Sequence, residues 1–97
     1  MDRLRNIHPG EVLKEEFLDL LKISQYRLAK DIHVEEIAIS EIVRGKRGIS
    51  ILMALKLSKY FGTTPKFWVN LQNDYELEEE MLSKKKELDE IYLYSKG

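Results

Sequence analysis

The chain has 97 residues, with 16 lysines and arginines against 17 aspartates and glutamates, and a formal net charge of −1. This length fits one domain with a single modest core. A content of 43% hydrophobic and 34% charged residues excludes a disordered chain and a membrane protein. Without cysteine there is neither a disulfide framework nor a thiolate metal site. The first six residues lack the apolar stretch of a signal peptide, so we expect a small cytoplasmic protein.

The predicted elements begin with three helices in the first half of the chain. Pro9-Gly10 opens the first helix, in which apolar residues recur at helical spacing as Val12, Leu13, Phe17, Leu20 and Leu21. Ser24 is a good N-cap for a short second helix, whose apolar side is Leu28, Ala29 and Ile32. A third helix begins near Glu35 and is stopped by Gly45 in a left-handed conformation, with Ile39, Ile42 and Val43 facing inward.

Two further helices complete the predicted domain. Ser50 caps the fourth, which ends at Gly62 and directs inward Leu52, Met53, Leu55, Leu57, Tyr60 and Phe61. Thr64-Pro65 starts a fifth, with Phe67 and Trp68 interpreted as core residues. Loops of two to five residues require neighbouring helices to pack directly on one another. We therefore predict an all-α fold: a compact five-helix domain with a C-terminal helical extension.

Residues 76–97 differ in composition from the predicted domain at 1–75. Blocks of like charge alternate along a helical stretch, first Glu78–Glu80, then Lys84–Lys86. Glu80 and Lys84 are spaced for an ion pair of the favourable orientation. A stripe of apolar residues runs along the same stretch: Leu77, Met81, Leu82, Leu88, Ile91 and Tyr92. The stretch is either a solvated terminal helix or a surface for a second subunit or a partner protein, and the apolar content favours the surface.

Catalytic chemistry is not expected in this sequence. The two histidines, His8 and His33, are far apart and have no second type of ligand nearby, so no metal site is predicted. None of the common hydrolase, metalloprotease or nucleotide-binding motifs is present. We therefore predict a protein that is not an enzyme, with no cofactor and no small-molecule substrate.

The informative unit runs from Ser24 to Arg47. Two helices of about eight residues flank a tight turn at 32–34, which is the helix-turn-helix arrangement. Ser24 and Gln25 place a hydroxyl and an amide at a helix N-terminus, where unpaired N–H groups and the helix dipole attract phosphate. After the second helix, basic residues gather in a glycine-punctuated loop that can follow a phosphate backbone: Arg44, Lys46 and Arg47.

The same unit and its flanks resemble a known family. Ser24-Gln25-x-x-Leu28-Ala29 and the run from Ile39 to Ile49 resemble the phage-repressor-like (xenobiotic-response-element) helix-turn-helix family. The block from His8 to Phe17 and the block from Ala54 to Tyr75 narrow the resemblance to the HigA-type antitoxins. It covers residues 8–75.

This resemblance implies a homodimer that binds double-stranded operator DNA, represses its own operon and neutralises a HigB-type toxin, an mRNA-cleaving ribonuclease related to the RelE family. Gln25 would contact the phosphate backbone. The exposed side of the recognition helix would enter the major groove with Glu35, Glu36, Ile37, Ser40 and Glu41. Arg44, Lys46 and Arg47 would anchor phosphates.

The sequence departs from the family pattern at the start of the recognition helix. Glu35 and Glu36 suit the helix dipole but repel phosphates, although a carboxylate can read a base by accepting a hydrogen bond from cytosine. His33 stands where relatives often have glycine, and it is expected in a left-handed conformation. Two alternatives therefore stay open: a stand-alone helix-turn-helix regulator without a toxin, and a protein-interaction module that has lost DNA binding.

Overall fold

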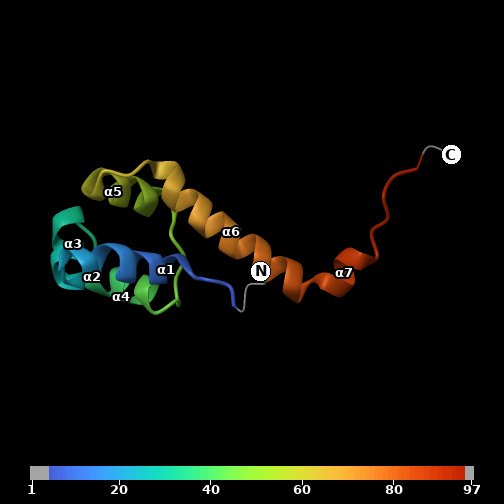
Figure 1. Cartoon of the computed structure of the whole chain (residues 1–97), viewed down its shortest axis with the longest axis horizontal. Coiled ribbons are helices and arrows are strands. Elements are labelled where there is room, and N and C mark those ends of the chain that lie inside the picture. The colour runs from blue at the N-terminus through green and yellow to red at the C-terminus, as the bar shows by residue number, and fades with distance from the viewer. Residues whose placement is uncertain (1–4, 96–97) are drawn as a thin grey trace.

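The computed structural model describes residues 5–95, and every regular element in that range is a helix. The elements are α1 (Pro9–Val12), η1 (Leu13–Leu18), α2 (Asp19–Leu21), α3 (Gln25–Ile32), α4 (Glu36–Val43), α5 (Ile51–Phe61), α6 (Pro65–Ser83) and α7 (Lys85–Asp89). Because α1, η1 and α2 follow one another without a gap, they form one helix, and the body consists of this helix and α3–α6 (Figure 1). The predicted all-α fold with five helices and a helical extension is confirmed.

The first helix contains a wide turn that the sequence analysis missed. Residues 13–18 form a π-helix, and the N–H of Asp19 bonds to the carbonyl of Lys14, five residues back. This extra residue in the turn shifts the positions that follow it. Leu18 is buried as a result, whereas Leu20 and Leu21 are 72% and 56% exposed. Leu20 and Leu21 continue the helical spacing of apolar residues in the sequence, but they do not face the core.

The predicted helix ends are confirmed. The side-chain oxygens of Ser24, Ser50 and Thr64 accept hydrogen bonds from the backbone N–H groups of Arg27, Met53 and Phe67, at 3.0, 3.1 and 3.1 Å. Each cap satisfies one of the amide groups that a helix leaves unpaired at its start. Gly45 and Gly62 adopt positive φ angles of 75° and 78° where α4 and α5 end.

The core is formed by side chains from all five helices of the body. The largest fully buried side chains in the described part include Leu13, Leu28, Ile39, Leu57 and Trp68. On α5, the buried positions are Met53, Ala54, Leu57 and Ser58, which form a narrow stripe at helical spacing. Leu52 and Leu55 lie outside this stripe and are exposed, so the prediction that they face inward is wrong. Phe67 is 37% exposed and packs against Phe17 at the edge of the core, so it is only partly a core residue.

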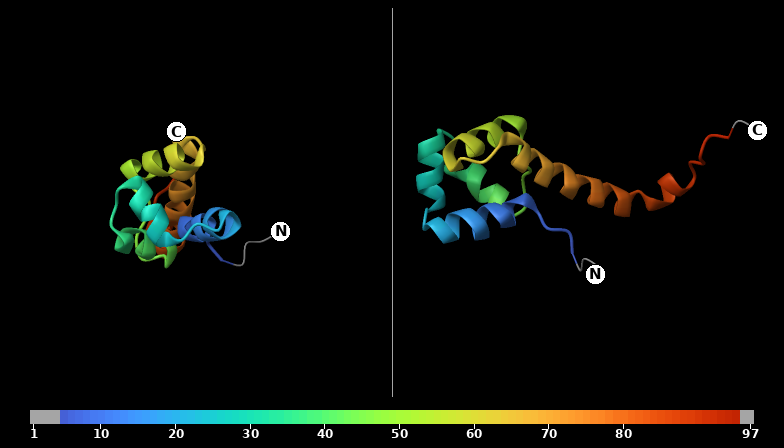
Figure 2. Two further views of the ribbon diagram at one scale, coloured as in Figure 1. Left: turned by 90° about the vertical axis from the view of Figure 1, so that its left-hand side faces the viewer. Right: turned by 45° about the horizontal axis from the view of Figure 1, so that its top comes forward.

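Helix α6 joins the body to the extension. It runs for 19 residues, about 28 Å, and passes residue 75 without a break, so the predicted domain boundary falls inside a helix. Figure 2 shows the C-terminal half of α6 and α7 projecting from the body, which gives the chain extents of 59 × 26 × 25 Å. The segment 44–50 between α4 and α5 is longer than the predicted loops. No helix among the described residues has the length and apolar character needed to cross a membrane.

Candidate nucleic-acid interface

Helices α3 and α4 and the turn between them form the predicted helix-turn-helix. Leu28, Ala29 and Ile32 of α3 are buried against the inner side of α4, which contributes Ile39 and Ile42. His33 ends α3 in the left-handed conformation, with φ 62° and ψ 51°, as the sequence analysis predicted. The backbone N–H of Val34 then bonds to the carbonyl of Ala29 at 3.0 Å. The turn therefore fixes the direction in which α4 leaves α3.

The start of α3 presents Ser24 and Gln25. The Ser24 hydroxyl already accepts a bond from the N–H of Arg27, so its oxygen serves as the helix cap. Gln25 is half-buried at the first position of the helix. The remaining amide groups of this first turn are the part of the site that can receive a phosphate oxygen.

A hydrogen-bonded network holds α3 against α5. Tyr60 on α5 donates its hydroxyl proton to Asp31 at 2.6 Å, and the Arg27 guanidinium binds the same carboxylate at 2.7 Å. The bond from Tyr60, with the one from Arg27, lowers the pKa of Asp31, and the shared Asp31 carboxylate raises the pKa of Tyr60. Asp31 is therefore ionised at neutral pH, and it keeps the Arg27 side chain along α3.

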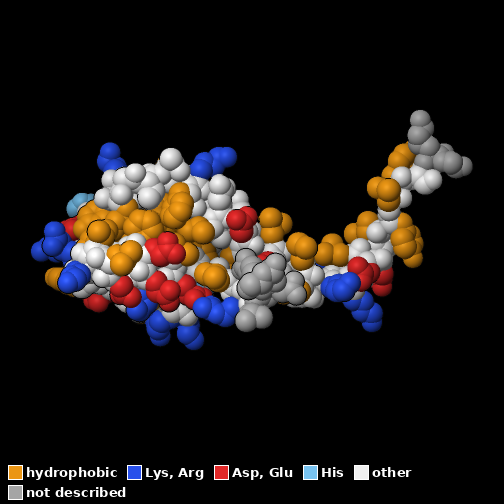
Figure 3. Space-filling model, viewed as in Figure 1, with side chains coloured by type: hydrophobic (Ala, Val, Ile, Leu, Met, Phe, Trp, Pro, Cys, Tyr) orange, Lys and Arg blue, Asp and Glu red, His pale blue; other side chains and the backbone are white. Residues whose placement is uncertain are grey.

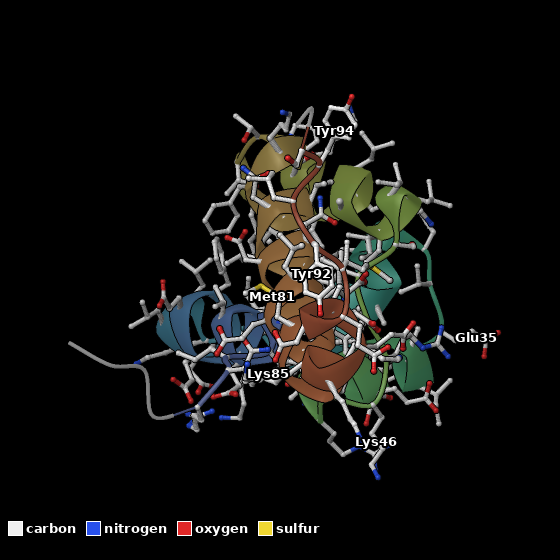
Figure 4. The ribbon with its side chains drawn as sticks, turned by 90° about the vertical axis from the view of Figure 1, so that its right-hand side faces the viewer. Glu35, Lys46, Met81, Lys85, Tyr92 and Tyr94 are labelled. Atoms are coloured by element: carbon white, nitrogen blue, oxygen red, sulfur yellow. The ribbon has the colours of Figure 1, made fainter. Side chains whose placement is uncertain are left out.

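The exposed side of α4 carries the residues predicted to read bases. Glu35 is the N-cap residue, and its side chain makes no capping hydrogen bond. Glu35, Glu36 and Ile37 are exposed, whereas Ser40 and Glu41, one turn later, are partly buried. The structure thus brings the five predicted residues onto one helix, with the two glutamates at its leading end. Figure 4 shows Glu35 at the edge of the body.

Two residues predicted to have different roles bind each other. Arg47 donates from Nε and Nη2 to the same oxygen of Glu41, at 2.9 and 2.6 Å. This pair ties the loop after α4 back to the recognition helix. Glu41 neutralises Arg47 locally, and the guanidinium keeps its other donors for a phosphate. The sequence does not predict this pairing, because six residues and a change of chain direction separate the two side chains.

Arg44 and Lys46 lie at the other end of α4. The Arg44 side chain reaches the carbonyl of Ser40 at 3.4 Å, and neither residue forms an ion pair with the part of the chain that the structure describes. Gly45 between them has φ 75°, so the backbone turns sharply at this point. Figure 4 places Lys46 at the lower edge, and Figure 3 shows lysine and arginine side chains along the same edge beneath α4.

A buried glutamine that the sequence analysis left without a role anchors the basic loop. Gln72 on α6 accepts a bond from the backbone N–H of Ile49 at 2.7 Å and donates to Glu76 at 2.7 Å. At the start of the loop, the N–H of Lys46 bonds to the carbonyl of Glu41 at 2.8 Å. The loop that carries Lys46 and Arg47 is therefore held at both ends. In the sequence, the sign of this anchoring role is a polar residue on the otherwise apolar inner side of α6.

The first helix packs closely against α4. A Cβ atom on Gly10 would lie 1.8 Å from the carbonyl oxygen of Ile42, so only glycine allows this approach. His8 is buried and caps the same helix, since its Nδ1 accepts the N–H of Gly10 at 2.8 Å. Burial lowers the pKa of His8, and the ring is neutral at pH 7. His8 and His33 thus have structural roles, and residues 5–95 contain no group of three metal-ligating side chains.

Comparisons with known proteins identify a family and several relatives that match this sequence. Residues 13–68 match the family model described as helix-turn-helix. The chain is 48% identical over 71 residues to virulence-associated protein I of Dichelobacter nodosus, with 73% of this chain matched. It is 34% identical over 73 residues to antitoxin HigA-1 of Vibrio cholerae, with 75% of this chain and 69% of that protein matched. It spans 61–66% of the length of virulence-associated proteins I and A' of Dichelobacter nodosus and a helix-turn-helix regulator of Haemophilus influenzae.

Solved structures match over more of the chain. The Pseudomonas aeruginosa antitoxin HigA with the higBA promoter is 41% identical, with a TM-score of 0.91 over 94% of this chain and all of that one. A HigA-family antidote protein from Coxiella burnetii is 40% identical, with a TM-score of 0.87 over 94% of this chain and all of that one. Antitoxin GraA in complex with its operator is 34% identical, with a TM-score of 0.87 over 98% of this chain and 97% of that one.

Proposed function

Since the chain belongs to the helix-turn-helix family, in its HigA-type branch, we propose that it is an antitoxin and transcriptional autorepressor. It binds operator DNA as a homodimer and neutralises a HigB-type toxin, an mRNA-cleaving ribonuclease. One observation carries this proposal: the likeness to an antitoxin structure that contains its own promoter extends over 94% of this chain, beyond the helix-turn-helix.

The geometry of the helix-turn-helix supports the following DNA contacts. The first turn of α3, with Gln25, receives a backbone phosphate, and α4 enters the major groove. Glu36, Ile37 and Ser40 face base edges from the exposed side of α4. Arg44, Lys46 and Arg47 hold phosphates beside it. Glu41 limits the affinity because its carboxylate contacts Arg47, and Glu35 adds a carboxylate at the start of α4 that repels phosphates.

The neutralising role is tested by isolation of the partner. The tagged full chain is purified from its native host, and the proteins retained with it are weighed by mass spectrometry. We expect a small basic protein in stoichiometric amount that is released only by denaturant. Expression of that protein alone should arrest growth, and co-expression of this chain should restore it. If the chain is produced normally and nothing co-purifies, the antitoxin function is wrong.

A stand-alone regulator is the second candidate function. It is favoured by the names of several relatives, among them helix-turn-helix transcriptional regulators of Haemophilus influenzae and Escherichia coli, for which no toxin is named. Binding to the promoter of its own gene distinguishes both regulator functions from an interaction module without DNA binding. Retention on that DNA should fall steeply as the salt concentration rises. The absence of salt-sensitive retention on that DNA would favour the interaction module.

A further inference from the structure

The last turn of the first helix exposes two neighbouring leucines. Leu20 and Leu21 are 72% and 56% exposed. They reach the surface because the π-turn at 13–18 places Leu18 in the core in their stead. Turns of this kind inside α-helices occur frequently at functional sites. The local geometry of the first helix thus presents apolar side chains to the outside of the molecule.

Phe17 joins these leucines to aromatic side chains of α5 and α6. It lies about one helical turn before Leu20 and Leu21. Its ring centroid is 4.9 Å from that of Phe61 and 6.0 Å from that of Phe67, and Phe67 is 37% exposed. We call these five residues the first-helix patch. Figure 3 shows hydrophobic side chains gathered between the positions of α2 and α5 in Figure 1, with acidic side chains beside them.

Negative charge accompanies the first-helix patch. Between residues 9 and 21, the charged side chains are four carboxylates and one lysine: Glu11, Lys14, Glu15, Glu16 and Asp19. Lys14 pairs with Asp19 at 2.8 Å. Glu15 and Glu16 are exposed, and neither forms an ion pair with the part of the chain that the structure describes. Two carboxylates beside the patch are therefore available to cationic groups of another molecule.

We propose that the first-helix patch is the surface through which the chain binds its toxin, with Glu15 and Glu16 paired to basic side chains of that toxin. This inference rests on the proposed function and adds the surface that carries out the neutralisation. A ribonuclease binds the phosphate backbone of its mRNA, so its surface is basic. In the complex, the apolar patch supplies most of the binding free energy, while the two carboxylates orient the toxin and accelerate association.

Two other apolar surfaces of the described chain fit a basic partner less well. Leu52 and Leu55 are exposed on α5, but the charged residues of that helix are Lys56 and Lys59, which repel cations. In the extension, the exposed apolar residues are accompanied by charge blocks of both signs, which do not favour a cationic surface. The first-helix patch is therefore the apolar surface with the charge that a ribonuclease requires.

Toxin binding by variants of the full chain tests this surface. The probe is the small basic protein that co-purifies with the unmodified chain, which is released by denaturant, refolded alone and titrated against each immobilised chain. Leu20→Asn with Leu21→Asn should raise the dissociation constant about tenfold or more, because two leucines no longer enter the interface. Leu52→Asn with Leu55→Asn is the matched control on α5 and should change it by less than about twofold.

A second variant tests the charges and leaves the apolar side chains intact. Glu15→Gln with Glu16→Gln should weaken toxin binding at low salt and reduce the dependence of the dissociation constant on salt concentration. Glu87→Gln with Glu90→Gln, at exposed positions of the extension, is the matched control and should leave both quantities unchanged. The helical circular dichroism signal confirms that each variant is folded.

Two results would overturn the proposal. Toxin binding that is unchanged in both first-helix variants would exclude the patch. A greater loss in Leu52→Asn with Leu55→Asn, or in Leu77→Asn with Leu82→Asn, would place the toxin on α5 or on the extension. Failure of the proposed function is recognised separately, because the unmodified chain would then retain no basic protein. Failure of this surface alone leaves the unmodified chain bound to its toxin.

Discussion

The two halves of α6 show how burial depends on neighbouring helices rather than on helix formation. In the first half, Trp68 is fully buried and Gln72 is nearly so, because α1 and α5 pack against them. In the second half, Leu77, Met81 and Leu82 are equally apolar or more so, yet each is at least 60% exposed. One continuous helix thus contributes to the core through its N-terminal half and exposes apolar side chains in its C-terminal half.

Charged groups differ between the two regions in the same way. In the body, some carboxylates pair with residues from other parts of the chain, as Asp31 does with Tyr60 and Glu41 does with Arg47, beside local pairs such as Lys14 with Asp19. The ion pairs seen in the extension, Glu80 with Lys84 and Lys85 with Asp89, are local i,i+4 pairs. Local pairs stabilise a helix but do not fix its position relative to anything else.

The largest expected effect is the loss of core packing in the body. Leu28→Ala and Ile39→Ala each remove a fully buried side chain and should lower the free energy of unfolding by roughly 2–5 kcal/mol. Leu82→Ala is the matched control in the extension and should change it by less than about 0.5 kcal/mol. Urea unfolding of all variants at the same low protein concentration makes this comparison. Equal losses at both sites would show that the extension belongs to the core.

Removal of Arg47 is expected to have the next largest effect, on DNA binding. Arg47→Ala should weaken operator binding for all sequences and reduce the salt dependence by about one ion. Because Glu41 then loses its cation, the affinity should fall further than it does when Arg47→Ala is made in a Glu41→Gln background. Binding titrations at several salt concentrations measure both. Lys66→Ala, an exposed position at the start of α6, is the control, and an unchanged slope for Arg47→Ala would exclude a phosphate contact.

A smaller effect on DNA binding is expected at the N-terminal end of α4. Glu36→Gln removes an exposed carboxylate without changing the size of the side chain. If Glu36 accepts a hydrogen bond from cytosine, the base preference of the operator should change. If it only repels phosphates, non-specific affinity should rise. Selection of bound sequences from a random pool distinguishes the two, and no change in either quantity would show that Glu36 faces water in the complex.

The sequence predicts the parts of this molecule that local chemistry decides. Caps at Ser24, Ser50 and Thr64, and the left-handed residues His33 and Gly45, follow from side chains next to the backbone groups that they satisfy. The pattern misses features that depend on packing, since a single π-turn was enough to expose Leu20 and Leu21.

The same distinction between local chemistry and packing applies to the candidate site. Its residues could be placed on the correct elements because the helix-turn-helix is a local unit. Their interactions could not, because Glu41 meets Arg47 only after the chain reverses, and Gln72 reaches Ile49 from 23 residues away. The acidic start of α4 was visible in the sequence, but the neutralisation of a cation by Glu41 was not.

The smallest expected effect concerns the contact of the first helix with α4. Only the unprotonated Nδ1 of His8 can accept the N–H of Gly10, and burial lowers the pKa of His8 below its usual value near 6.5. The unfolded chain therefore binds more protons than the folded chain in slightly acidic solution. The contribution of His8 to stability is complete above about pH 6.5 and is lost as the pH falls through the lowered pKa of the folded state. Asparagine can cap the helix without titrating, so His8→Asn should flatten the loss of stability between about pH 6.5 and 5. An identical pH profile for the two proteins, measured by urea unfolding, would show that protonation of His8 does not disturb the cap.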